Sequence, residues 1–498
     1  MASVSLLLDG KTPDAALGAS VAQVSVRQML SAPALAAITF ADPPDSVNDI
    51  HIGTTLAVKA PTGETLIEAE VTAVERRLDP GQVRTLQVRG YDRLHRLRKK
   101  QTVRVLENQG LGDLASAMAN DIGISTKTEN APALRRALTV QHDQSDLDLL
   151  VQTADACGAY VVIADGALSL LTMAGDGTET ITLKAGETIL QARAESNAET
   201  MRRSTLARGW DVERAVPVEG RAGLATQDAV ELRGADALTA FAGMGDRLLV
   251  NRLAASPEEA TGLAQADMDR STAFTALLDA TVEGDPRLRP GRIVSLIGLG
   301  GDADGDYVLT ETEHHFDAEA GYVTHLSTRP PSVPRRDRSA GATIARVSDT
   351  ADPQSLGRVR ARMVAFGDIE SGWMPVLVLG AGEGKGIAIL PEPGDDVLVL
   401  MPEGDPARGI VLGGLYGERT PPGDRPATGA RTFTLRTPAG QVLTLDGARS
   451  VARIETGAGD VFEMAPEGSR MSLTRDLTVE APGHSITFRA SHIDFETA

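Results

Sequence analysis

Short apolar runs separated by turn residues fill the first 105 residues of the chain. In TLIEAEVTAV (65–74) apolar and polar residues alternate with a period of two, which indicates a half-buried β-strand. Pro61 and Gly63 interrupt the apolar pattern just before this run, as in a hairpin turn. Residues 1–105 are therefore predicted to form a β-domain.

The pattern changes to a helical period after residue 106. Leu111, Leu114, Met118 and Ile122 recur at spacings of three and four, and Gly123 follows them. This spacing predicts an amphipathic helix that ends at the glycine.

A second helix is predicted to begin after Ser145, because Asp148 can reach back to the Ser145 amide in a capping box. Gly158 is its predicted stop. Asp165-Gly166 then separates two apolar runs and predicts a tight hairpin. Residues 106–190 are thus a mixed α+β segment.

Strands return from residue 191 to about 335, interrupted by one helix. This helix is predicted to begin after Ser256, whose side chain can cap it. Pro257 would then be the first helical residue and Glu259 an acidic third residue. Residues 329–342 are rich in Pro and Arg and predict a linker. A compact β unit follows to residue 417, and 417–430 predicts a second linker.

The tail has the most regular pattern in the chain. Apolar residues recur as i,i+2 pairs at 433/435, 443/445, 452/454, 462/464, 471/473, 477/479, 486/488 and 493/495, with turn residues between most of them. Each pair gives a short strand one small apolar face, which cannot form a core alone. Residues 431–498 are therefore expected to pack against other chains in an intertwined oligomer.

Composition narrows the class of protein. The chain of 498 residues has a net charge of −19, which disfavours nonspecific nucleic-acid binding. It shows no long apolar span and no secretory signal pattern, and its single cysteine, Cys157, excludes an intrachain disulfide framework. Assembly in the cytoplasm is expected.

The β unit at 343–417 resembles the OB-fold domain of contractile-tail spike proteins: phage baseplate hub–spike proteins, VgrG of type VI secretion, and spikes of extracellular contractile injection systems. The stretches that carry the resemblance are DP at 352–353, LGRV at 356–359, PE at 391–392, GDP at 404–406 and GGLY at 413–416. Within this unit the candidate family-motif residues, all with structural roles, are Gly357, Arg358, Trp373, Pro391, Gly394, Asp395, Gly404, Asp405, Gly413 and Tyr416.

The rest of the chain resembles the hub of these proteins more loosely, in YDRLHRL, in residues 144–170 and in the strands at 288–327. The resemblance implies a mainly β fold with α+β insertions: a hub of two β-barrels with an α/β segment, an OB-fold, and a trimeric β-helix or β-prism spike. The implied domains are 1–105 (barrel 1), 106–190 (α+β), 191–335 (barrel 2 with a helical insertion), 336–417 (OB-fold), 418–430 (linker) and 431–498 (spike).

The implied function is mechanical. Such a homotrimer caps a hexameric tube protein, organises baseplate proteins, carries a PAAR-type tip protein and meets the target membrane on firing. No catalytic residue, cofactor, metal or nucleic-acid partner is predicted. Two alternatives stay open: a spike with cell-wall hydrolase activity, although no insert lies between the OB-fold and the tail, and a glycan-binding OB-fold protein.

The glycine-rich stretch GAGEGKG at 380–386 raises the possibility of a phosphate-binding loop. A phosphate loop needs a Ser/Thr after the lysine and a helix behind it. Gly386 follows Lys385, and Ile387 to Leu390 is expected to be a strand. The stretch is therefore predicted to be a loop between two barrel strands, with Lys385 in solvent.

Three sets of residues are candidates for holding a metal, and the first is acidic. Asp302, Asp304, Asp306 and Glu313 have calcium-loop spacing, but Tyr307 replaces the required glycine, so a solvated turn is favoured.

His314, His315 and His325 lie on a predicted hairpin, where His314 and His315 must face opposite ways. His484 and His492 would each appear three times near a trimer axis; ordinary surface positions are favoured for both.

The last two apolar pairs are out of phase, since 486/488 are even-numbered and 493/495 odd-numbered. A one-residue slip turns every later side chain to the other face, which predicts a bend or bulge between Ala490 and Ile493. Blunt strand ends with exposed Phe495 favour association. The tip partner is expected to dock on Ile493, Asp494, Phe495, Glu496, Thr497 and Ala498.

Overall fold

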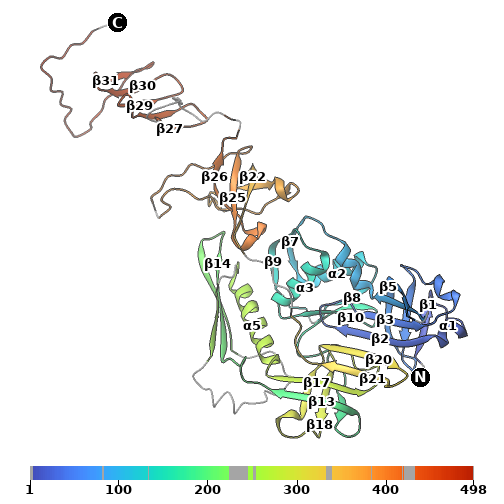
Figure 1. Cartoon of the computed structure of the whole chain (residues 1–498). Coiled ribbons are helices and arrows are strands. Elements are labelled where there is room, and N and C mark those ends of the chain that lie inside the picture. The colour runs from blue at the N-terminus through green and yellow to red at the C-terminus, as the bar shows by residue number, and fades with distance from the viewer. Residues whose placement is uncertain are drawn as a thin grey trace. The chain divides into compact units, whose positions relative to one another are not determined.

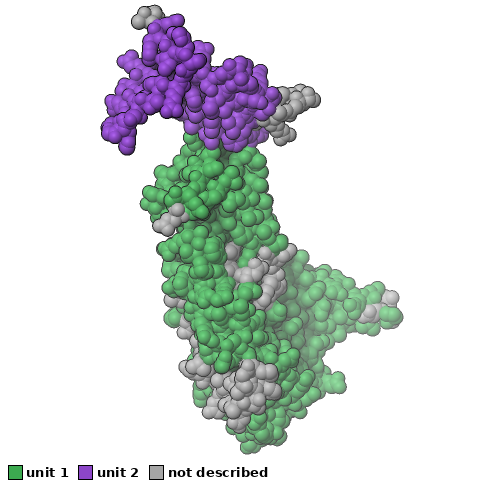
Figure 2. Space-filling model, turned by 90° about the vertical axis from the view of Figure 1, so that its left-hand side faces the viewer, with its two compact units in different colours: residues 1–415 green, residues 416–498 purple. Residues whose placement is uncertain are grey.

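The computed structural model describes residues 4–80, 83–129, 131–132, 134–223, 245–250, 254–332, 339–382, 384–417, 419 and 432–496. It divides into two compact units, residues 1–415 and 416–498, which are coloured separately in Figure 2. The predicted linker at 329–342 lies partly outside the described residues, and the linker at 418–430 does so except for residue 419.

A ten-stranded antiparallel sheet runs through both predicted hub segments (Figure 1). In order across the sheet its strands are β1 (Ser5–Leu8), β4 (Thr55–Lys59), β5 (Thr65–Asp79), β6 (Val83–Tyr91), β3 (Leu35–Ala41), β2 (Val21–Met29), β20 (Glu311–Asp317), β21 (Gly321–Ser327), β17 (Ala276–Glu283) and β13 (Ile189–Ser196). The pairing of β2 with β20 joins the two segments, with Val26 opposite His314.

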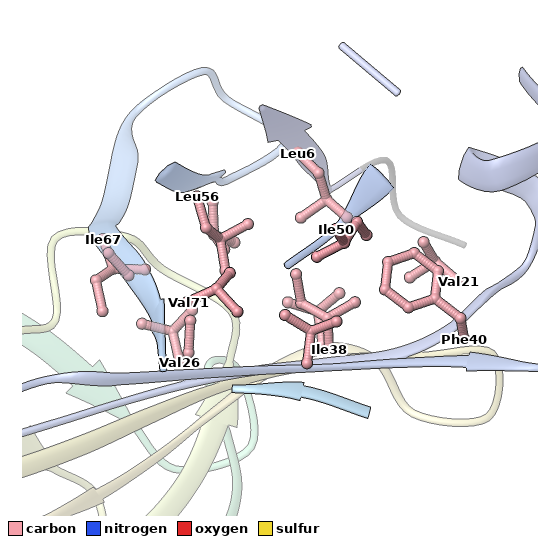
Figure 3. Close-up of a cluster of buried hydrophobic side chains, with 14 of the residues drawn as sticks. Leu6, Val21, Val26, Ile38, Phe40, Ile50, Leu56, Ile67 and Val71 are labelled. Carbon is pink, nitrogen blue, oxygen red and sulfur yellow. The ribbon is translucent and has the colours of Figure 1, made fainter. Parts of the chain in front are cut away.

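Each half of this sheet encloses its own hydrophobic core. The first core gathers side chains from β1 to β5 and from the η1 segment (Asp45–Asp49); in Figure 3 Leu6, Ile38, Phe40, Leu56 and Val71 point into one space. The second core uses β13, β17 and the small sheet of β12 (Ile181–Lys184), β18 (Ile293–Ile297) and β19 (Gly305–Val308). Two cores on one sheet agree with the predicted two-barrel hub.

The segment between them is mixed, as predicted. Two helices, α2 (Leu111–Asp121) and α3 (Asp146–Ala156), pack with η2 (Arg93–Lys99) on the sheet of β8 (Ser125–Lys127), β10 (Tyr160–Ala164) and β11 (Ala167–Leu171). Ser145 and Asp148 form both bonds of the predicted capping box. Asp165 and Gly166 both have positive φ, at 51° and 74°, as the tight hairpin turn requires.

The remaining elements of the hub are a strand pair, a short helix, and the longer helix α5 with its own sheet. β7 (Arg104–Gly110) pairs with β9 (Arg135–Gln141), and α1 spans Ala15–Ala19. The predicted helix after Ser256 is α5 (Pro257–Ala273), with the Ser256 hydroxyl accepting from the Glu259 amide. α5 packs on the sheet of β14 (Ser204–Asp211), β15 (Val216–Ala222) and β16 (Asp246–Leu249).

Residues 341–415 form a five-stranded sheet in the order β24 (Ile369–Glu370), β23 (Arg360–Met363), β22 (Gly341–Asp349), β25 (Asp396–Met401) and β26 (Ile410–Leu415). Its 3-10 turns are η4 (Val364–Phe366), η5 (Pro402–Gly404) and η6 (Pro406–Arg408), and η3 (Gly301–Ala303) lies in the hub. The core of this sheet is aliphatic and Met-rich.

The second unit contains an antiparallel meander of β27 (Thr432–Arg436), β28 (Val442–Asp446), β29 (Val451–Glu455), β30 (Val461–Ala465) and β31 (Gly468–Ser472). Five of the eight predicted tail strands are therefore present. The strands predicted at 477/479, 486/488 and 493/495 are absent from the described residues 473–496 of this single chain, so that expectation was wrong for the isolated chain. No described helix is long and apolar enough to cross a membrane.

Candidate functional site

The tail sheet is amphipathic, and its register explains why. Phe433, Leu445, Ala452 and Met464 lie opposite one another from β27 to β30. The parallel row beside it contains Leu435, Leu443, Ile454, Phe462 and Met471. Because side chains alternate between faces, all the apolar pairs of these strands share one face.

The other face of this sheet has a polar central row. Thr434, Thr444, Arg453, Glu463 and Arg470 form its central row. Arg453 pairs with Glu463 at 2.9 Å and with Glu455 at 3.0 Å. One face of the sheet is thus suited to water and the other is not.

The apolar face has no cover within the described part of the chain. Phe433 is 59% exposed, Ile454 53% and Met471 57%. Among the described residues, no buried hydrophobic side chain lies beyond Val411. The strands pair within one chain, which differs from the expected interchain pairing, and their apolar face stays exposed among the described residues.

The predicted tip segment is exposed and without strands. Ile493 is 50% and Phe495 94% exposed, and His492 pairs with Asp494 at 3.1 Å. A bend lies at Ser491, but the two strands whose phase it was expected to reset are absent from the described residues. Glu496 is also exposed, whereas Thr497 and Ala498 lie outside the described residues.

A buried ion pair organises the start of the OB unit. The Arg358 guanidinium is 3% exposed and donates to Asp352 at 2.8 Å and to Glu213 at 2.7 Å. The bond from Arg358, opposed by desolvation, holds the pKa of Asp352 well below its usual range. Glu213 follows β14, so this motif arginine connects the OB unit to the hub.

A second buried carboxylate lies at the same junction. Glu259, at the start of α5, accepts from Arg408 of η6 at 2.9 Å and pairs with Arg136 of β9 at 3.2 Å. Its side chain is 6% exposed, and its pKa is lowered because the two arginines and the Ala255 amide outweigh desolvation. Three segments of the chain therefore meet on one carboxylate.

Sequence reasoning missed this junction. Glu259 was assigned only to a helix start, and Arg408, Arg136 and Glu213 were not singled out. The two ends of the Arg408–Glu259 bond are 149 residues apart, and no local pattern connects them.

Most of the motif glycines and aspartates of the OB unit lie in its turns, while Gly413 lies at a bulge within β26. Gly357, Gly394, Gly404 and Gly413 have positive φ, between 69° and 155°. Asp395 accepts from the Glu392 amide and Asp405 from the Ala407 amide, both at 2.9 Å.

The other three motif residues, Trp373, Pro391 and Tyr416, lie at the surface or near it. Arg360 lies 5.1 Å from the centre of the Trp373 ring. Pro391 precedes the turn at Gly394, and Tyr416 is 52% exposed.

The glycine-rich stretch is a loop, as predicted. Lys385 is exposed, no helix follows, and Gly382 and Lys385 bond to each other through their backbones. The strand expected at Ile387 to Leu390 is absent from the assigned strands, because this segment makes a single backbone bond, from the Ile387 amide to Leu379.

The acidic turn and the cysteine have structural roles. Asp304 accepts from the amides of Gly298, Leu299 and Gly300, which occupies both its oxygens. Burial raises the pKa of the Cys157 thiol, contrary to what a nucleophile needs. Within the described residues, no group of three His, Cys, Asp or Glu is placed to hold a metal ion.

The hub histidines separate by face as predicted. The rings of His315 and His325 lie 6.4 Å apart, whereas His314 is fully buried on the other side. His314 lies within hydrogen-bond distance of the Leu288 carbonyl, at 3.1 Å, and of the Tyr322 and Thr324 hydroxyls, at 3.0 and 3.1 Å. Desolvation lowers the pKa of His314 to about 4.

This shift makes part of the stability pH-dependent. An unfolded histidine titrates near 6.5, so the unfolded state binds more protons between about 6.5 and 4. The stabilisation that comes from the neutral His314 ring is therefore complete above pH 6.5. As the pH falls from 6.5 to 4, the free energy of unfolding decreases by about 3 kcal/mol in total. We expect His314→Gln to lose this dependence in urea unfolding measured at pH 7.5, 6 and 4.5.

The difference between the wild-type and variant curves is the informative quantity. Asp92 changes the stability in the opposite direction. Burial raises its pKa to about 7, so its contribution to the free energy of unfolding falls as the pH rises from about 4 to 7. Asp92 is present in both proteins and cancels. A wild-type-minus-variant difference that stays constant with pH would contradict the assignment to His314.

Two family models match the chain. Residues 343–416 match the type VI secretion system/phage-baseplate injector OB domain, and residues 60–318 match the Alg8 N-terminal domain. No curated protein matches the chain.

Solved structures share the fold at low identity. The E. coli c3393 protein, a component of the type VI secretion system with structural similarity to the T4 bacteriophage tail proteins gp27 and gp5, is 15% identical; the match covers 82% of this chain and 99% of that one, with a TM-score of 0.52. A chain of the lidded Francisella PdpA-VgrG complex is similar at 10% identity over 91% of this chain and 76% of that one, with a TM-score of 0.56.

The OB-unit match falls on the sheet that Arg358 and Arg408 tie to the hub, and the hub match includes strands from both halves of the ten-stranded sheet. The fold is that of VgrG-like spike proteins. Because the Alg8 N-terminal domain model spans more than half of the 498 residues, the chain belongs to that family.

Proposed function

We propose that this chain is the structural hub and spike of a contractile injection machine, and that it works as a homotrimer. The observation that carries the proposal is the tail sheet, whose apolar pairs fall in register on one uncovered face. Three such sheets arranged as a prism would turn their apolar faces inward and the Arg453–Glu463 face outward. Most soluble homo-oligomers have closed rotational symmetry, which repeats one interface around the axis.

The hub supports a role at the end of a sixfold tube. Its two halves each have a core on one continuous sheet, so three copies would offer six similar surfaces to a hexameric tube protein. The buried carboxylate of Glu259 and the buried guanidinium of Arg358 bind the OB unit to this hub. Such connections suit a part that transmits force from the tube to the spike.

The chemistry fits a mechanical role. The singled-out polar groups serve turns, caps and ion pairs, and Asp304 and His314 are engaged by neighbouring groups. The chain would cap the tube, organise baseplate proteins and be driven through the target envelope when the sheath contracts. A PAAR-type tip protein would dock on the exposed residues from Ile493 onward.

Copurification with the machine's own tube and tip proteins tests this function. The full chain should run at three times its 52.3 kDa mass in light scattering and retain both proteins. A chain that ends after Ala490 should lose the tip protein and keep the tube protein, since the hub is unchanged. A monomer that retains neither protein would overturn the proposal, and equal tip binding by the shortened chain would refute the tip site.

A further inference from the structure

A cavity of about 470 Å³ lies where the first half of the hub meets the mixed α+β segment. Its lining comes from β2, β5, η2 and β10, from the turn between β10 and β11, and from the loop between β17 and β18. These segments are far apart in the sequence, so only the fold brings their polar groups together. The cavity takes no part in the tail sheet or in the junction at Glu259.

Asp92 is the most deeply buried charged residue of this lining. It is 6% exposed, and its two carboxylate oxygens accept from the Ala34 and Leu94 amides, each at 3.0 Å. Within the described residues no basic side chain forms an ion pair with Asp92, and Arg98 acts on it only over a longer distance. Burial raises the pKa of Asp92 to about 7, as expected for a carboxylate without a close counter-charge. A cation in the cavity would supply that charge.

Gln28 provides a second open acceptor in the lining. Its Nε2 atom donates to the Leu66 carbonyl at 2.9 Å, which fixes the orientation of the amide. Its Oε1 atom is buried and has no donor within the described part of the chain. A buried acceptor without a donor is unfavourable, so a ligand that donates to this oxygen gains free energy there.

The basic groups of the lining are already engaged, whereas its carboxylates are not all paired. Arg289 pairs with Asp165 at 2.7 Å, and Arg93 donates to the Gly123 carbonyl at 3.1 Å. Glu68 is exposed and forms no ion pair or hydrogen bond with the described residues. The unused capacity of the cavity is therefore for positive charge and for hydrogen-bond donors.

The apolar part of the lining suits a short alkyl chain. Ile124 and Ile163 are half-buried and line the cavity beside the polar groups. An ammonium group has three donors and no acceptor, and the methylene groups of a lysine pack well on aliphatic surfaces. Ligand pockets commonly combine such apolar walls with a few polar groups that fix the orientation of the ligand.

We propose that this cavity binds an alkylammonium group, which donates to Asp92 and to Gln28 Oε1 and lies near the carboxylate of Glu68. A lysine side chain of a partner protein and a free diamine share this chemistry. The site goes beyond the proposed mechanical function, because it requires neither the trimer nor the tail.

Isothermal titration calorimetry of the full-length protein with butylamine tests the site. Butylamine should bind about tenfold more tightly than butanol, which lacks the charge, and than butanoate, which reverses it. Asp92→Asn should weaken butylamine binding about tenfold, since asparagine can still cap η2 but carries no charge. If butanoate binds more tightly than butylamine, the cavity serves an anion through Arg93 and Arg289, and the proposal is overturned.

Glu68→Gln keeps the test decisive if Asp92→Asn does not fold, because Glu68 is exposed. It should weaken butylamine binding about threefold. Glu187→Gln, which removes an exposed carboxylate outside the cavity, is the matched control and should bind butylamine like the wild type. Equal binding by the wild type, Glu68→Gln and Asp92→Asn would contradict the site, as would a wild type that binds no butylamine. Oligomeric state is not a readout here, so failure of this site and failure of the trimer are distinguishable.

Two further probes separate the sources of the ammonium group. N-acetyl-lysine methylamide presents a lysine side chain, and putrescine is a free diamine. Tighter binding of the blocked lysine assigns the site to a lysine of a partner protein, and tighter binding of putrescine assigns it to a free diamine. Binding of neither probe would overturn the proposal.

Discussion

Replacing Leu445 by aspartate is expected to convert the trimer into folded monomers. Leu445 lies in the apolar row of the tail sheet and is 46% exposed in one chain. In a prism it would be buried, and an unpaired carboxylate there costs about 3 kcal/mol or more in each of three chains. Light scattering should show the 52.3 kDa monomer, with the hub signal in circular dichroism unchanged.

Thr444→Asp is the matched control. It places the same carboxylate one residue earlier, on the polar face between Thr434 and Arg453. This variant should remain a trimer. If both variants dissociate equally, the apolar face is not the interface; if neither does, the tail does not hold the trimer together.

Removing the Glu259 carboxylate is expected to destabilise the first unit strongly. Glu259→Ala leaves Arg136 without this counter-charge and leaves Arg408 with only its longer pair to Asp405, at 3.5 Å. Breaking a buried pair from one side costs about 3 to 5 kcal/mol. Urea unfolding followed by tryptophan fluorescence is suitable, because Trp373 lies in the OB unit and Trp210 on β14.

A double-mutant cycle that combines Glu259→Ala with Arg408→Ala identifies which interaction accounts for the lost stability. The two losses should not add, since each removes the same bond. Glu187→Ala, which breaks an exposed pair with Lys184, should leave the midpoint unchanged. Strictly additive losses would show that Glu259 acts through something other than Arg408.

Local signals predicted the secondary structure where one segment contains all the groups involved. The Ser145–Asp148 capping box, the Ser256 cap of α5 and the Asp165-Gly166 turn each need only a few neighbouring residues. Their energetics do not depend on the rest of the fold, so the sequence was sufficient. The loop at 380–386 was predicted in the same way, from its glycines, of which Gly380, Gly384 and Gly386 take up positive φ.

The prediction failed where pairing depends on a distant or absent partner. Ile387 to Leu390 has strand composition, but it makes one backbone bond and stays outside the assigned strands. The apolar pairs beyond residue 473 have the same spacing as those of β27 to β31 and form no strand in this chain. A strand needs a neighbour for its ladder, and composition does not supply one.

The sequence by itself determined the class of protein: a β-rich, acidic chain with an OB unit and a tail whose two-residue apolar faces cannot form a core alone. The tertiary structure decided which surfaces meet. It paired β2 with β20 into one sheet and brought Arg136 and Arg408 to Glu259. It also aligned the tail pairs on a single face. These contacts join residues far apart in the chain or depend on strand register, which is fixed by packing and not by local pattern.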